Sequence, residues 1–171
     1  PGAASASADA YVRTLRGDLE HSGIFRVINP TAYISDPQSS GLTLESINFE
    51  NWRTIGALGL ATGSLESTAE GIAVDARYFD IANRSLVGGR RLVGGAGDAK
   101  RMGHRMADAI LEFLTGIPGP FESRIAFVSD RGGRFREVWA YTFDGEVKPI
   151  TRHNSITMSP SWHPSSRSLL F

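Results

Sequence analysis

The sequence predicts an α+β domain, with helices packed on a mixed sheet, followed by a segment built of strands alone. Three observations lead to this prediction. Helix-like and strand-like periods alternate up to about residue 115, residues 116–123 have the glycine- and proline-rich composition of a linker, and only short strand-like runs follow. We therefore expect two domains, over residues 1–118 and 119–171.

A helix over residues 8–22 is the first element expected. Val12, Leu15 and Leu19 recur at helical spacing and predict its apolar stripe. Gly23 follows the last apolar position, where a left-handed residue commonly ends a helix.

Strands make up most of the chain that follows. The run at residues 25–28 predicts a short strand, and Asn48 can cap a brief helix that reaches Ile55. Alternation of apolar and polar residues then predicts three more strands. They are expected over residues 57–65, 72–81 and 85–93.

A second long helix is expected between Asp98, as its cap, and Gly116. Its apolar face consists of Met102, Met106, Ala109, Ile110 and Phe113. Its basic flank consists of Lys100, Arg101, His104 and Arg105. We interpret this flank as a solvated surface, with His104 exposed on it or at an interface.

Short strands are expected beyond the linker, over residues 124–129, 137–143 and 146–151, with Asp144-Gly145 as a hairpin turn. Residues 120–127 and 164–171 echo each other at a spacing of 44 residues. Repeats of about 40–45 residues with four strands each are typical of β-propellers. Because short apolar windows often match by chance, the echo alone leaves a propeller repeat and a coincidence equally open.

The composition limits the classes of function. The 18 basic and 18 acidic residues cancel, which argues against nucleic-acid binding as the main role, since that binding is driven by counterion release from a basic surface. The absence of cysteine excludes disulfides and thiolate metal sites. No apolar run approaches the roughly 20 residues that span a bilayer, and no leader is visible.

The sequence lacks residues that the known catalytic and cofactor-binding motifs require. The glycine-rich segment 88–97 leads into a helix, but Lys100 does not follow a glycine and no Ser or Thr follows it, as a phosphate-binding loop requires. No G-x-S-x-G elbow occurs. The histidines lack the spacing of a zinc-binding helix; they are His21, His104, His153 and His163. The sequence therefore predicts no catalytic residue, cofactor site or metal site.

Residues 152–164 form the segment that is most informative about binding. A loop leads into a short strand and then into an aromatic and proline turn, as happens where one propeller blade passes into the next. Loops at that passage line the mouth of the central channel. Arg152, His153 and Asn154 are therefore predicted to contact a partner, and Trp162 is interpreted as packing between blades.

Several of these segments resemble the TolB family of Gram-negative bacteria. Residues 100–129, KRMGHRMADAILEFLTGIPGPFESRIAFVS, are similar to the family's basic helix, its Leu-Thr-Gly ending and its first propeller strand. The run SPSWHP at residues 159–164 is similar to the family's repeat, which the chain departs from at His163, Ser165 and Ser166. The resemblance covers nearly the whole chain from about Tyr11.

The resemblance implies a six-bladed propeller, of which residues 119–171 hold the first blade and a fragment of the second. It implies a periplasmic, non-catalytic adaptor of the Tol–Pal system, with a signal peptide upstream of this sequence. The implied partners are a Pal-type lipoprotein, at the propeller mouth, and TolA, through an extreme N-terminal segment that is expected, like the signal peptide, upstream of this sequence. The implied role is outer-membrane integrity and constriction at division. We expect a monomer that uses no cofactor, binds no nucleic acid and does not insert into a membrane.

Two other classes of function stay open. The chain is alternatively a propeller-containing fragment of a serine peptidase of the prolyl oligopeptidase or tricorn-like kind, which a G-x-S-x-G domain downstream would indicate. A stand-alone ligand-binding domain would need a pocket within residues 1–115. Because a lone blade has no neighbour to stack on, we expect residues 1–118 to fold alone and residues 124–171 to be only marginally ordered in isolation.

Overall fold

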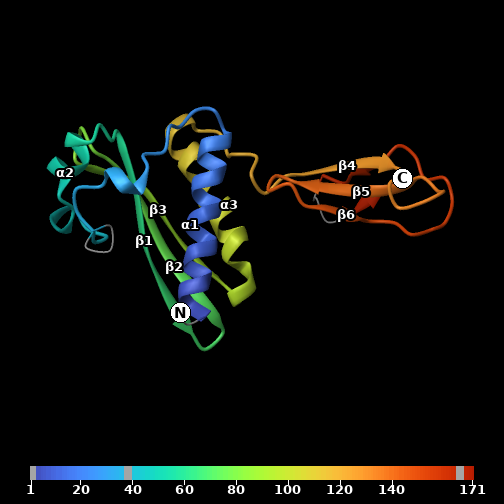
Figure 1. Ribbon diagram of the computed structural model, residues 1–171, viewed down its shortest axis with the longest axis horizontal. Helices are drawn as coiled ribbons and strands as arrows, with labels where there is room; N and C mark the ends of the chain where they lie inside the picture. The colour runs from blue at the N-terminus through green and yellow to red at the C-terminus, as the bar shows by residue number, and fades with distance from the viewer. Residues whose placement is uncertain (1–2, 37–39, 165–167) are drawn as a thin grey trace. The chain divides into compact units, whose positions relative to one another are not determined.

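The chain forms two units in the computed structural model, which describes residues 3–36, 40–164 and 168–171 (Figure 1). The first unit spans Pro1–Phe121 and the second Glu122–Phe171. Within the described residues, every helix lies in the first unit, and the second holds strands and loops. Ser165 and Ser166, where the chain departs from the TolB repeat, lie outside the described residues.

The first unit is built on a three-stranded sheet in the order β1-β2-β3. Its strands are β1 (Gly59–Thr68), β2 (Gly71–Asp80) and β3 (Ser85–Gly94), which confirms the three strands predicted there. The sheet is antiparallel throughout, so the expected mixed sheet is wrong. Consecutive strands joined by such short turns can pair only in opposite directions.

The short strand predicted at residues 25–28 is also wrong. The segment pairs with no other strand among the residues that the structure describes. Ile28 instead packs against a hydrophobic cluster, and its carbonyl accepts a hydrogen bond from Arg16 Nη2 at 3.4 Å. The apolar residues favour an extended backbone, but side-chain packing takes the place of a partner strand.

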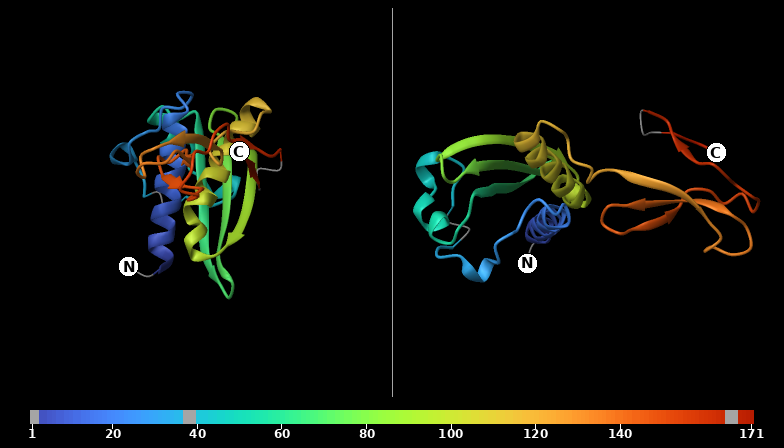
Figure 2. Two further views of the ribbon diagram at one scale, coloured as in Figure 1. Left: turned by 90° about the vertical axis from the view of Figure 1, so that its right-hand side faces the viewer. Right: turned by 90° about the horizontal axis from the view of Figure 1, so that it is seen from above.

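Two long helices, α1 (Ala3–His21) and α3 (Ala99–Thr115), pack side by side on one face of the sheet (Figure 2). α1 begins five residues earlier than expected and buries Tyr11, Leu15 and Leu19. Val12, predicted in its apolar stripe, is 48% exposed. Tyr11 takes that place, while Leu15 and Leu19 are buried as predicted.

The apolar face of α3 is largely as predicted. Met102, Met106, Ala109 and Ile110 are buried. The helix ends at Thr115, and Gly116, expected to terminate it, caps it in a left-handed conformation with a φ of 75°. Asp98 stands at the N-cap but makes no capping bond to α3, because its Oδ2 accepts from the Gly95 amide at 2.9 Å.

α1 and α3 touch where α3 has no side chain. A Cβ on Gly103 would lie 2.9 Å from the Tyr11 carbonyl oxygen and 2.9 Å from Thr14 Cβ, so the two backbones approach more closely than any other residue permits. Beside this contact, His104 Nδ1 lies 2.6 Å from Asp18 Oδ2, with the two side chains 11% and 6% exposed. The interpretation of His104 as a surface or interface residue is therefore wrong.

The opposite face of the sheet is covered at one end by the short helix α2 (Phe49–Thr54) and the chain before it (Figure 2). Asn48 Oδ1 accepts from the Asn51 amide at 3.3 Å, which confirms the predicted cap. A second core forms here around Trp52 and Phe79. Its buried members are Ile47, Phe49, Trp52, Ala57, Leu60, Phe79 and Ile81.

The second unit contains an antiparallel sheet of three strands and a separate pair of short strands. The sheet consists of β4 (Arg124–Ser129), β5 (Glu137–Thr142) and β6 (Val147–Pro149), and the pair of β7 (Ser161–Trp162) and β8 (Leu169–Leu170). Gly145, at φ 86°, forms the predicted hairpin turn. The described strands do not form a four-stranded blade, so the propeller stays a prediction.

Both faces of the β4-β5-β6 sheet carry apolar side chains. Val138 and Ala140 are buried on one face. On the other, Phe127 pairs with Trp139 and is half-buried, while Ile125 is 62% and Tyr141 40% exposed. A sheet that is apolar on both faces is stable only when both are covered.

We expect two Gly→Ala substitutions to have opposite effects on the first unit. Alanine is the better helix former, so Gly17→Ala, whose Cβ would meet only His21 Nδ1 at 4.0 Å, should stabilise by about 0.5–1 kcal/mol. Gly103→Ala should destabilise by about 1–3 kcal/mol, because its Cβ pushes α1 away from α3. Urea unfolding measures both, and stabilisation by Gly103→Ala would show that the contact is looser than described.

Hydrogen exchange of the isolated chain should separate the two units. Amides of β1, β2 and α3 should be well protected, whereas those of β4 and β5 should exchange at least ten-fold faster, because Ile125 and Tyr141 leave one face of their sheet uncovered. Mass spectrometry of peptides from the two units makes the comparison. Equal protection in both would contradict this expectation.

Candidate partner-binding surface

The loop that carries Arg152, His153 and Asn154 lies at one end of the β4-β5-β6 sheet. Since β6 runs antiparallel to β5 and Pro149 pairs with Trp139, the chain leaves β6 beside the start of β5. The loop between β4 and β5, residues 130–136, reaches the same end. Its last residue, Arg136, accepts a hydrogen bond at its carbonyl from the Thr157 amide at 2.9 Å.

Thr151 anchors the start of the loop. This buried side chain accepts a hydrogen bond from the Val138 amide at 2.9 Å and donates one to Glu137 Oε2. The Ile150 and Thr151 amides both donate to the Val138 carbonyl, at 2.8 and 3.2 Å. The chain is therefore fixed to β5 immediately before Arg152.

Glu137 fixes the loop on its other side. Its Oε1 accepts from the Asn154 amide at 2.7 Å, so one carboxylate holds both Thr151 and Asn154. The hydrogen bond from Thr151 lowers the pKa of Glu137 most, and the Asn154 amide and the charge of His153 lower this pKa further. The lowered pKa keeps the carboxylate ionised and able to accept both bonds.

All three predicted contact residues lie on this fixed loop and are exposed. Asn154 has a φ of 55°, a left-handed conformation that asparagine tolerates better than most residues. The His153 ring lies 5.3 Å from that of Phe171, centroid to centroid. The structure thus places the three together on an accessible surface, and their role in binding stays a prediction.

Sequence reasoning missed the residues around this loop. Glu137 and Thr151, which hold it, are 14 residues apart, and only the strand register brings them together. Arg131, Arg134 and Arg136 on the neighbouring loop are exposed as well. The arginine-rich run RGGRFR at residues 131–136 was the available signal for this second part of the surface.

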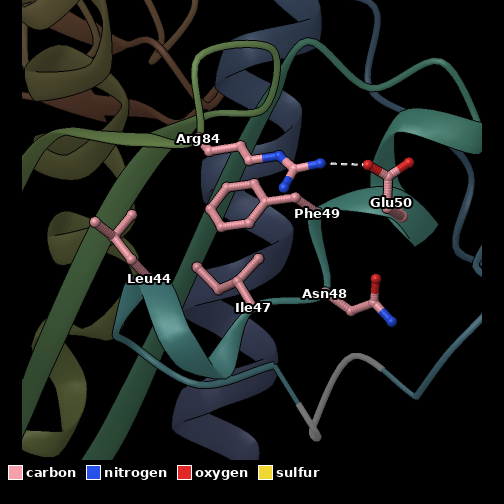
Figure 3. Close-up of a pocket in the computed structure, with 6 residues that line it drawn as sticks. All are labelled: Leu44, Ile47, Asn48, Phe49, Glu50 and Arg84. Carbon is pink, nitrogen blue, oxygen red and sulfur yellow. Dashed lines mark hydrogen bonds and ion pairs between the residues drawn. The ribbon is translucent and has the colours of Figure 1, made fainter.

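A separate hollow lies in the first unit (Figure 3). It is open, with a volume of about 430 Å³, and is lined by Leu44, Ile47, Asn48, Phe49, Glu50 and Arg84. Its one carboxylate, Glu50, is ion-paired with Arg84 and, at 2.9 Å, with Arg53. Both carboxylate oxygens are therefore engaged by guanidinium groups at the surface of this hollow.

Metal binding and membrane insertion find no support in the described part of the chain. It contains no group of three or more His, Cys, Asp or Glu side chains placed to hold a metal ion. Among the helices searched there, none is long and apolar enough to cross a membrane.

One family model and several known proteins that are similar to this chain carry the name TolB. A family model for the TolB amino-terminal domain matches residues 2–87. The Tol-Pal system protein TolB of Syntrophotalea carbinolica is 36% identical over 91% of this chain and 36% of its own length. That of Desulfosudis oleivorans is 36% identical over 99% of this chain and 38% of its own length.

Among solved structures, the crystal structure of TolB from Acinetobacter baumannii is similar, with a TM-score of 0.75 and 25% identity. The match covers 93% of this chain and 39% of that one. The chain therefore spans little more than a third of the length of these relatives.

We expect Thr151→Val to raise the pKa of Glu137 toward its ordinary value of 4.5, because the main hydrogen bond to the carboxylate is lost. A lowered folded-state pKa contributes stability above the ordinary value, and this contribution is lost as pH falls through the folded-state pKa. The variant should therefore lose the loop's order at a higher pH than the parent.

A carboxyl-carbon NMR titration of Glu137 makes this measurement. Thr157→Val is the control, since Thr157 is equally buried but bonds to Arg136 through its backbone amide. A Glu137 titration that is the same in Thr151→Val and the parent would contradict the proposed anchoring.

Proposed function

Because this chain belongs to the TolB family, we propose that it is the amino-terminal part of a non-catalytic periplasmic adaptor in a Tol–Pal system. The observation that carries the proposal within the second unit is the fixed loop at residues 150–154. Glu137 and Thr151 set its backbone while Arg152 and His153 stay exposed. A preorganised loop loses little entropy on binding, as a partner-binding surface requires.

The second unit is the beginning of a β-propeller in this proposal. Two features support it: the 44-residue echo in the sequence and the β4-β5-β6 sheet with apolar residues on both faces. A blade has this character because each of its faces packs against a neighbouring blade. The half-buried Phe127 and Trp139 and the exposed Ile125 and Tyr141 would then be covered in the full-length protein.

The proposed partners are a Pal-type lipoprotein and TolA. The lipoprotein would meet the propeller mouth at Arg152, His153 and Asn154, and TolA would bind an N-terminal segment expected upstream of this sequence. Linking these partners would support outer-membrane integrity and constriction of the envelope at division. The proposed protein acts as a monomer and works through binding alone.

We expect His153→Ala in the full-length protein to weaken binding to the soluble domain of a Pal-type lipoprotein by ten-fold or more. A side chain on a rigid loop at the centre of an interface often contributes this much. Isothermal titration calorimetry measures the dissociation constant. His21→Ala is the control, because His21 is exposed on α1 of the first unit.

Two results would contradict the proposal. Absence of binding by the parent protein would remove the lipoprotein as a partner. Equal affinity of His153→Ala and the parent would remove this loop from the interface.

A further inference from the structure

The end of the second unit that carries residues 150–154 is strongly basic. Four arginines are exposed there: Arg131, Arg134 and Arg136 on one loop and Arg152 on the other. Asp130 and Glu137 are the acidic residues of the same segments. Glu137 is already engaged by Thr151 and Asn154.

Three of these arginines are electrostatically unpaired. Among the described residues, Arg134, Arg136 and Arg152 have no ion-pair partner, and Arg131 stacks on the rings of Phe127 and Trp139 at 5.1 and 5.5 Å. Elsewhere in the chain exposed arginines do pair with carboxylates, as Arg84 does with Glu50 and Arg90 with Glu112. The surface therefore has positive charge that an incoming group can neutralise.

The charge is also polarised within the unit. Residues 122–171 contain seven basic and five acidic residues, and four of the basic ones gather at this end. At the other end, around the β5–β6 turn and the start of β4, the charges are mixed: Arg124, Asp144, Glu146 and Lys148 lie there, with Lys148 Nζ paired to Glu146 Oε1 at 2.8 Å. The basic end is thus a local feature of a chain with no net charge.

Exposed apolar side chains lie among the arginines. Phe135 is 39%, Ile156 69% and Met158 58% exposed. The hydrogen bond between the Thr157 amide and the Arg136 carbonyl holds their two segments together. Arginine mixed with aromatic residues and methionine is the composition enriched in protein–protein interfaces.

We propose that this arginine-rich end binds an acidic protein surface, whose carboxylates pair with Arg134, Arg136 and Arg152 around an apolar centre. The inference rests on the proposed function, since it specifies the chemistry of the partner that meets residues 152–154. A nucleic acid fits less well, because the exposed Phe135, Ile156 and Met158 among the arginines give this end the mixed apolar and arginine composition of protein–protein interfaces. An anionic membrane is the other source of negative charge, and the experiment separates it.

The test is the double substitution R134S/R136S in the full-length protein. It removes two unpaired charges without touching the anchored loop at residues 150–154. R13S/R26S is the matched control, which removes two exposed arginines of the first unit that likewise have no ion pair among the described residues. Binding to the soluble domain of a Pal-type lipoprotein is measured at low and at high salt.

R134S/R136S should bind about ten-fold more weakly than the parent at 50 mM salt, and the difference should shrink at 500 mM, since peripheral charges act through screened, long-range attraction. R13S/R26S should bind like the parent. Equal binding by R134S/R136S and the parent would overturn the inference and leave the proposed function standing.

A second probe keeps the two proposals distinguishable. A Glu-Ser repeat peptide should bind the parent directly, more tightly than a Gln-Ser peptide of the same length, and R134S/R136S should lose this difference. The comparison of the two peptides tests whether the arginine-rich end binds acidic groups even if the lipoprotein does not bind the parent. Failure of the Glu-Ser peptide, or tighter arginine-dependent binding to phosphatidylglycerol vesicles than to this peptide, would overturn an acidic protein as the partner.

Discussion

The contact between α1 and α3 at Gly103 is the constraint on which the first unit depends. Without a side chain there, the backbone of α1 lies within van der Waals distance of α3, which brings Asp18 and His104 to 2.6 Å of each other. The pair satisfies two polar groups that the helix contact would otherwise bury alone. The two helices can then cover one face of the sheet as a single layer.

In the second unit the corresponding constraint is the carboxylate of Glu137, which holds the loop at residues 150–154 in place. Glu137 receives hydrogen bonds from Thr151 and Asn154, so that the beginning and end of a short loop are both tied to the first residue of β5. Residues whose backbone is fixed in this way can expose their side chains without losing a defined position. Order in this loop thus comes from hydrogen bonds to one ionised group and to the backbone of Val138.

Sequence patterns predicted which segments form helices and strands better than they predicted which of these segments pack or pair with each other. Alternation along β2 and helical spacing along α3 are local signals, and both elements were found as expected. The run at residues 25–28 has the same local signal as a strand, but among the described residues it pairs with no strand and Ile28 packs on a hydrophobic cluster instead. The predictions for His104 and Val12 were wrong for a related reason: which side of a helix is buried depends on its neighbour, and α1 packs on α3 at Gly103, which adds no side chain to the apolar stripe. Arg152, His153 and Asn154 were located by their place in a repeat, whereas Glu137, Arg134 and Arg136 join them only through the register of β5 and β6.

Net charge and local charge lead to different conclusions about this chain. Equal numbers of acidic and basic residues argue against a polyanion as the main ligand. The same balance says nothing about how the charges are distributed, and strand pairing collects four arginines at one end of one sheet. At physiological salt, charges interact over roughly 8 Å, so a partner that approaches this end meets the local cluster and not the neutral whole. A neutral protein can therefore select an acidic partner, provided that its fold concentrates the basic residues where its loops are already fixed.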